Sequence, residues 1–199
     1  MNSNRHRIAP ETTCIWSLGH CVIRILITAL LCAYPANTTA EKTGQAYEYE
    51  AKIALLYNFA KFTVWPKDAF ENDDSPFIFA VLGKNPFGDA FSLLRDKKIG
   101  GRSIEMRHFS EPLDFVPCQI LYCTLTDFKR FTKVHPNLLE QQHVLTVGEQ
   151  DEFVKKDGIL LLLFVDDHLA FKVNTKAARS AGIEISATLL RLATEIIKE

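Results

Sequence analysis

Aromatic and polar side chains gather where an amphipathic stretch of the sequence ends. Tyr57, Asn58, Lys61 and Trp65 lie close together, directly before Pro66. Polar and aromatic groups at the end of a helix often form the rim of a binding surface, because such side chains combine contact area with hydrogen bonding. We therefore predict that these four residues contribute to binding a partner.

Residues with catalytic or metal-binding chemistry are present, but their spacing matches no motif. His108, His135, His143 and His168 fall in separate expected elements. The sequence contains no HExxH, no GxSxG and no Walker lysine. The turn at 83–88, GKNPFG, fits no nucleotide-binding fingerprint. We predict a protein that is not an enzyme, with no catalytic residues, no metal and no cofactor.

Two cysteines remain once the first 40 residues are set aside. Cys118 and Cys123 belong to one apparent strand, and an extended chain places them roughly 16 Å apart at ~3.3 Å per residue. A disulfide needs Cα atoms within roughly 7 Å. We predict no intrachain disulfide between Cys118 and Cys123.

The N-terminus has the pattern of a secretory signal peptide. Arg5, Arg7 and Arg24 precede a short apolar run at 25–33, followed by small residues that end at Ala40. We predict cleavage near Ala40; a retained N-terminal anchor is the alternative. Cleavage lowers the 23 basic residues to 20 and the 24 acidic residues to 23, a formal charge of −3. This mildly acidic balance gives no reason to expect nucleic acid as a partner.

A helix is expected from about residue 46 until Pro66 prevents its continuation. Spacings of three, four, seven and eleven residues predict one face built from Ala51, Ala54, Leu55, Asn58 and Phe62. We expect this helix to pack on a sheet, with Leu55 fully buried.

Strands and short helices alternate through the rest of the chain. Apolar runs predict strands at 77–82, 103–109, 119–125, 143–147 and 159–165, and a return strand at 169–173 makes a late hairpin. A final helix is expected from Ser186, with an apolar stripe formed by Leu189, Ala193, Ile196 and Ile197. The predicted fold class is α/β: a single domain at 41–199, with a mixed, mostly parallel sheet, flanking helices and a late antiparallel hairpin.

Four charged residues in the closing segment have no expected role in the fold. They are Lys176, Arg179, Glu184 and Arg191. Each taken singly fits an ordinary solvated helix face, but as a group they are candidates for partner contact, since arginines often contribute strongly to interfaces.

Several ordered motifs resemble those of the YfiR family, from about Ala46 to Ala193. They are KIALLYNFAKFTVWP, AVLGKNPFGDAF, CQILYC, HVLTVGEQDEFVKKDGILLLLF and AFKVNTKAARSAGIEISATLLRLA. Three positions depart from the family pattern. This chain has Ala80 where the family often has a cysteine that can pair with the one matching Cys118. It has Asp157-Gly158 where the family often has two glycines, and it has Lys172 where the family often has an acidic residue.

The resemblance implies a non-catalytic periplasmic regulator. Such a protein binds the periplasmic portion of an inner-membrane diguanylate cyclase and represses it, which controls cyclic di-GMP and biofilm formation. The resemblance also implies a homodimer and an outer-membrane lipoprotein as counter-regulator. Two alternatives stay open: a periplasmic small-molecule-binding sensor module, and a stand-alone hydrolase.

Overall fold

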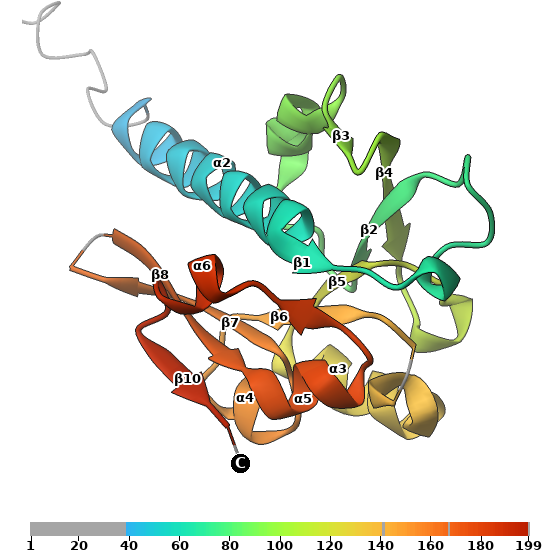
Figure 1. Cartoon of the computed structure of the whole chain (residues 1–199). Helices are drawn as coiled ribbons and strands as arrows, with labels where there is room; N and C mark the ends of the chain where they lie inside the picture. The colour runs from blue at the N-terminus through green and yellow to red at the C-terminus, as the bar shows by residue number, and fades with distance from the viewer. Residues whose placement is uncertain (1–38, 141, 167, 199) are drawn as a thin grey trace, which may run out of the picture. The chain divides into compact units, whose positions relative to one another are not determined.

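Residues Gly44–Glu199 are built on an eight-stranded sheet in the computed structural model, which describes residues 39–140, 142–166 and 168–198 (Figure 1). The strand order is β10-β8-β7-β6-β5-β2-β4-β3. The strands are β2 (Phe77–Leu82), β3 (Lys98–Ile99), β4 (Arg102–Phe109), β5 (Ile120–Cys123), β6 (Leu145–Gly148), β7 (Leu160–Val165), β8 (His168–Asn174) and β10 (Glu195–Ile197). A separate two-stranded sheet pairs β1 (Thr63–Val64) with β9 (Glu184–Ile185).

The sheet is mostly parallel, as the sequence predicts. The five adjacent strands β4, β2, β5, β6 and β7 run parallel to one another. Strand β8 then returns antiparallel to β7, β10 is parallel to β8, and β3 is antiparallel to β4. The predicted α/β fold class and the late hairpin are confirmed.

Helices cover both faces of the sheet. They are α2 (Thr39–Phe62), α3 (Leu125–Val134), α4 (Glu152–Lys155), α5 (Thr175–Ser180) and α6 (Ala187–Leu190). Apolar side chains of α2, α5 and α6 share one core cluster with the odd-numbered residues of β2, and those of α3 and α4 share the second with its even-numbered residues. A strand buried on both faces needs an unbroken apolar run, which explains the sequence FIFAVL.

The buried face of α2 differs from the predicted one. Ile53, Leu56 and Phe59 are almost completely buried, whereas Leu55 is only partly buried and Asn58 is exposed. The predicted face is therefore wrong by about one residue. The charged Lys52 lies on the buried side, and its presence there hides the apolar periodicity of the helix.

The predicted final helix ends much earlier than expected. Helix α6 stops at Leu190, and Ile196 and Ile197 belong to strand β10. The backbone N–H and the Oγ1 of Thr194 both donate to the carbonyl oxygen of Phe171, each at 2.9 Å. These hydrogen bonds lie directly before the residues of β10 that pair with β8. Ile196 and Ile197 are β-branched, and β-branched residues fit a strand better than a helix.

The turn before β7 explains one departure from the family pattern. Asp157 has a φ of 64°, in the left-handed region that glycine adopts most easily and that aspartate tolerates. A Cβ on the adjacent Gly158 would lie 2.2 Å from the Phe153 ring, so this position has room only for glycine.

The predicted signal peptide falls almost entirely outside the described residues, so it stays a prediction. Within the ranges that the structure describes, no helix is long and apolar enough to cross a membrane.

Candidate functional site

The small sheet formed by β1 and β9 joins the segment that follows α2 to Glu184, one of the predicted partner-binding residues of the closing segment. Thr63 pairs with Ile185, and Val64 pairs with Glu184. The end of α2, with its aromatic and polar residues, is thereby joined to the closing segment. Sequence reasoning proposed the two groups separately and did not predict that they would be neighbours.

Tyr57 and Trp65 are fixed by hydrogen bonds to the main chain. The hydroxyl of Tyr57 donates to the Lys98 carbonyl at 3.3 Å, and the indole N–H of Trp65 donates to the Ala60 carbonyl at 2.9 Å. The Trp65 ring also packs edge-on against Phe77, with 5.2 Å between ring centroids. Both residues therefore support the local structure as well as contributing surface.

Asn58 and Lys61 point toward solvent at the same helix end. The Lys61 ammonium lies 5.6 Å from the centroids of both the Tyr57 and the Phe62 rings, a cation–π arrangement. The Phe62 side chain is 43% exposed. This end of α2 thus presents a positive charge above aromatic surface.

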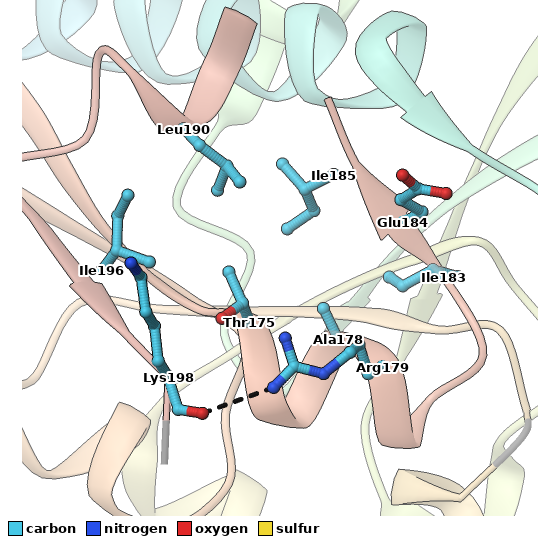
Figure 2. Close-up of a pocket in the computed structure, with 9 residues that line it drawn as sticks. All are labelled: Thr175, Ala178, Arg179, Ile183, Glu184, Ile185, Leu190, Ile196 and Lys198. Carbon is cyan, nitrogen blue, oxygen red and sulfur yellow. Dashed lines mark hydrogen bonds between the residues drawn. The ribbon is translucent and has the colours of Figure 1, made fainter. Parts of the chain in front are cut away.

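A groove of about 650 Å³ lies between α5, β9, α6 and β10 (Figure 2). Its apolar lining comes from all four elements: Ala178, Ile183, Ile185, Leu190 and Ile196. Its polar lining residues are Thr175, Arg179, Glu184 and Lys198. The volume falls within the range of about 300–1,000 Å³ that is usual for binding sites.

Two of the four charged residues predicted in the closing segment line this groove. Arg179 and Glu184 face it from α5 and β9, whereas Lys176 lines a different depression. Arg191 is exposed and donates to the hydroxyl of Thr188 at 3.4 Å. The guanidinium of Arg179 donates to the carbonyl oxygen of Lys198 at 3.3 Å, which holds it at the β10 end of the groove (Figure 2).

Lys172, the third departure from the family pattern, links two elements electrostatically. Its ammonium lies 3.0 Å from the Glu195 carboxylate on β10 and 3.6 Å from the Asp151 carboxylate before α4. The hydrogen bond with Glu195 is the main reason why the pKa of Lys172 is raised. An acidic residue at this position would instead meet two carboxylates.

A buried lysine forms a polar network that sequence reasoning missed. Lys52 on α2 is 3% exposed, and its ammonium contacts the carboxylates of Glu48 at 2.5 Å and Glu149 at 2.8 Å. The hydroxyl of Tyr122 also donates to Glu149, at 2.8 Å. Burial disfavours the charge on Lys52, but the hydrogen bonds with Glu149 and Glu48 outweigh it and raise the pKa. The spacing of Glu48 and Lys52 suggests an ordinary surface pair, so the sequence gives no sign of burial.

Both described cysteines are free thiols in the core. Cys118 and Cys123 are buried in the cluster beneath α3 and α4. Burial raises the pKa of each thiol well above its ordinary value of 9.0, so little nucleophilic thiolate forms at neutral pH. The predicted lack of a disulfide between them stays a prediction.

The described histidines and acidic residues do not assemble a metal centre. Across the described ranges, no group of three or more histidine, cysteine, aspartate or glutamate side chains is placed to hold a metal ion. His143 instead joins neighbouring segments: its Nε2 lies 3.3 Å from the Asp68 carboxylate and its Nδ1 lies 3.3 Å from the Gly182 carbonyl.

One of three comparisons with known proteins supports the family resemblance. No curated protein matches the chain. One solved structure that is similar is the crystal structure of a conserved domain protein from Vibrio cholerae O1 biovar eltor str. N16961, with 13% sequence identity and a TM-score of 0.45. The alignment covers 74% of this chain and only 60% of the length of that protein. The family model described as YfiR/HmsC-like matches residues 49–194. The chain therefore belongs to the YfiR/HmsC-like family.

Proposed function

We propose that the protein binds and represses an inner-membrane diguanylate cyclase, and that it thereby lowers cyclic di-GMP and limits biofilm formation. Membership of the YfiR/HmsC-like family indicates a periplasmic regulator of diguanylate cyclase signalling. Members of this family are regulatory rather than catalytic. The observation that supports a specific contact surface is the groove of the closing segment, where Arg179 and Glu184 flank an apolar lining.

The groove and the end of α2 together have the composition of a protein interface. An apolar centre with a polar rim is the usual arrangement of such surfaces, and arginine and aromatic residues often contribute most to binding. Repression requires that this surface bind an inactive state of the cyclase more tightly than the active state, since equal affinity for both states shifts nothing.

We also propose that the protein reaches the periplasm through cleavage of its leader near Ala40. Mass spectrometry of the periplasmic protein should give the mass of residues 41–199, and a mass that includes the leader would contradict the proposal. From the family resemblance, a homodimer and a counter-regulating outer-membrane lipoprotein complete the proposed system.

The test of repression compares cyclic di-GMP in cells that carry the parent gene, a deletion or a variant. Arg179→Ala combined with Glu184→Ala should raise cyclic di-GMP toward the deletion level. The control is Arg130→Ala on α3, which is exposed and outside both groups of proposed contact residues. Repression by the folded double variant as strong as that of the parent would exclude the groove. An unchanged cyclic di-GMP level after deletion would contradict the function itself.

The second candidate function is a small-molecule sensor, favoured by the volume and the mixed lining of the same groove. It is distinguished by reconstituting the purified protein with cyclase in proteoliposomes. Repression without any added small molecule supports the direct regulator. Repression only after adding a low-molecular-weight periplasmic fraction supports the sensor.

A further inference from the structure

The two strands that border the groove each have an unpaired edge. Within the ranges that the structure describes, β9 pairs only with β1, and β10 pairs only with β8 at the end of the large sheet. An unpaired strand edge presents backbone donors and acceptors that can accept a further strand. On β10 the carbonyl oxygen of Ile197 already accepts a hydrogen bond from the Thr175 hydroxyl at 3.0 Å, so β9 is the strand that can be extended into the groove.

The pairing of β9 shows which of its backbone groups are turned outward. The N–H of Ser186 donates to the Phe62 carbonyl at 3.0 Å, immediately beside the pair formed by Ile185 and Thr63. Residues of an antiparallel strand alternately direct their backbone groups toward and away from the partner. The N–H and the carbonyl of Ile185 consequently point away from β1, and Ile185 itself lines the groove.

The charges of the groove are arranged as opposites across its width. The Glu184 carboxylate lies on the β9 side, whereas Arg179 and Lys198 lie together on the other side (Figure 2). The side chains of Ile185, Leu190 and Ile196 make an apolar patch across the groove from Arg179, and Glu184 lies beyond Ile185 at one end of this patch (Figure 2). Such a groove complements a segment that carries an apolar side chain and a nearby acidic residue.

We propose that the groove binds an extended segment of the cyclase by strand addition to β9. The backbone of this segment hydrogen-bonds to Ile185, its apolar side chain enters the patch, and an acidic residue pairs with Arg179. Main-chain pairing supplies affinity in this mode, and the pockets for alternate side chains supply specificity. This inference rests on the proposed function and specifies how the partner is held.

The test uses synthetic 15-residue peptides that tile the periplasmic portions of the source organism's diguanylate cyclases. Binding to the purified protein is measured by fluorescence anisotropy, and exchange of the Ile185 amide by hydrogen–deuterium exchange. One peptide should bind and slow exchange at Ile185. N-methylation of its amides, one at a time, should weaken binding at least tenfold at the amide that donates to the Ile185 carbonyl and far less at the two neighbouring amides, which face away from β9.

Charge reversal tests the orientation. Arg179→Glu should weaken peptide binding at least tenfold, and a peptide whose acidic residue is changed to lysine should recover most of the loss. A merely structural role of Arg179 would show no such recovery. Arg130→Glu, on α3, is the control and should leave binding unchanged.

The outcomes separate strand addition from the proposed function. Failure of every peptide to bind, or equal sensitivity to N-methylation at neighbouring amides, overturns strand addition. If cyclic di-GMP still rises on deletion of the gene, the regulatory function survives that failure. If deletion of the gene leaves cyclic di-GMP unchanged, the proposed regulatory function is contradicted. Peptide binding then no longer supports an interaction that represses a cyclase.

Discussion

The buried network around Lys52 predicts that removing a carboxylate and removing the lysine change stability by different amounts. Lys52 is almost completely buried, whereas the side chains of its partners Glu48 and Glu149 are 38% and 34% exposed. Removing a carboxylate leaves part of a positive charge uncompensated in the core, but removing the lysine leaves two carboxylates that can return to water. We expect Glu149→Gln to destabilise the protein more than Lys52→Met.

The magnitudes follow from these contacts. Glu149 accepts hydrogen bonds from Lys52 and from Tyr122, and a hydrogen bond to a charged group contributes about 1.5–3 kcal/mol. Because Glu48 still compensates Lys52, Glu149→Gln should cost roughly 2–3 kcal/mol, below the ~3–5 kcal/mol of a fully broken buried pair. Lys52→Met keeps an unbranched apolar side chain beside the Tyr49 and Phe164 rings and should cost about 0–1 kcal/mol.

Urea denaturation of the parent and both variants at pH 7 measures these free energies of unfolding. The exposed pair Lys129–Glu152, with 3.3 Å between the charged atoms, supplies the control. Lys129→Met and Glu152→Gln should each change stability by less than about 1 kcal/mol. If Lys52→Met costs as much as Glu149→Gln, the ammonium is effectively hydrated and the reasoning from burial is refuted.

Three further predictions test the core. Leu56→Ala should cost about 2–5 kcal/mol, and the same change at the partly buried Leu55 should cost clearly less; equal losses in urea denaturation would contradict the observed face of α2. Gly158→Ala should cost more than 1 kcal/mol, because the added methyl group displaces a buried phenylalanine ring; an unchanged urea midpoint would contradict the close contact. Because burial raises the pKa of the Cys118 and Cys123 thiols, the unfolded chain loses these protons at a lower pH than the folded protein does. The contribution of the two buried thiols to the free energy of unfolding is therefore complete below about pH 9 and is lost as the pH rises further. The urea midpoint should therefore fall above about pH 9, and replacing both cysteines with alanine should make that fall shallower; an identical slope would contradict the assignment.

Local patterns in the sequence were sufficient to predict much of the sheet. The run FIFAVL has no polar residue and becomes a strand buried on both faces. Asparagine is a favoured helix-capping residue, and the Asn174 side chain accepts a hydrogen bond from the Ala177 N–H at 2.9 Å. These signals act over a few residues, so the sequence alone reveals them.

Features that depend on distant residues were not predictable in the same way. Leu189, Ala193 and Ile196 have helical spacing, but pairing with β8 makes Ile196 part of a strand. The charged residues of the closing segment were identified without their groove, which forms only when α5, β9, α6 and β10 come together. Only Arg179 and Glu184 of that group line it.

The pairing of β1 with β9 also has a consequence for how the chain acquires its structure. It joins Thr63 to Ile185, so this contact near the start of the domain cannot form until residues close to the end of the chain have been synthesised. Contacts between residues so distant in sequence slow folding, because a large loop must close before they form. Until then, Leu56 and Phe59 of α2 lack the apolar neighbours that the closing segment supplies to their shared core cluster. An incompletely synthesised chain therefore exposes a hydrophobic helix face, which makes it a substrate for chaperones and proteases until the last residues arrive.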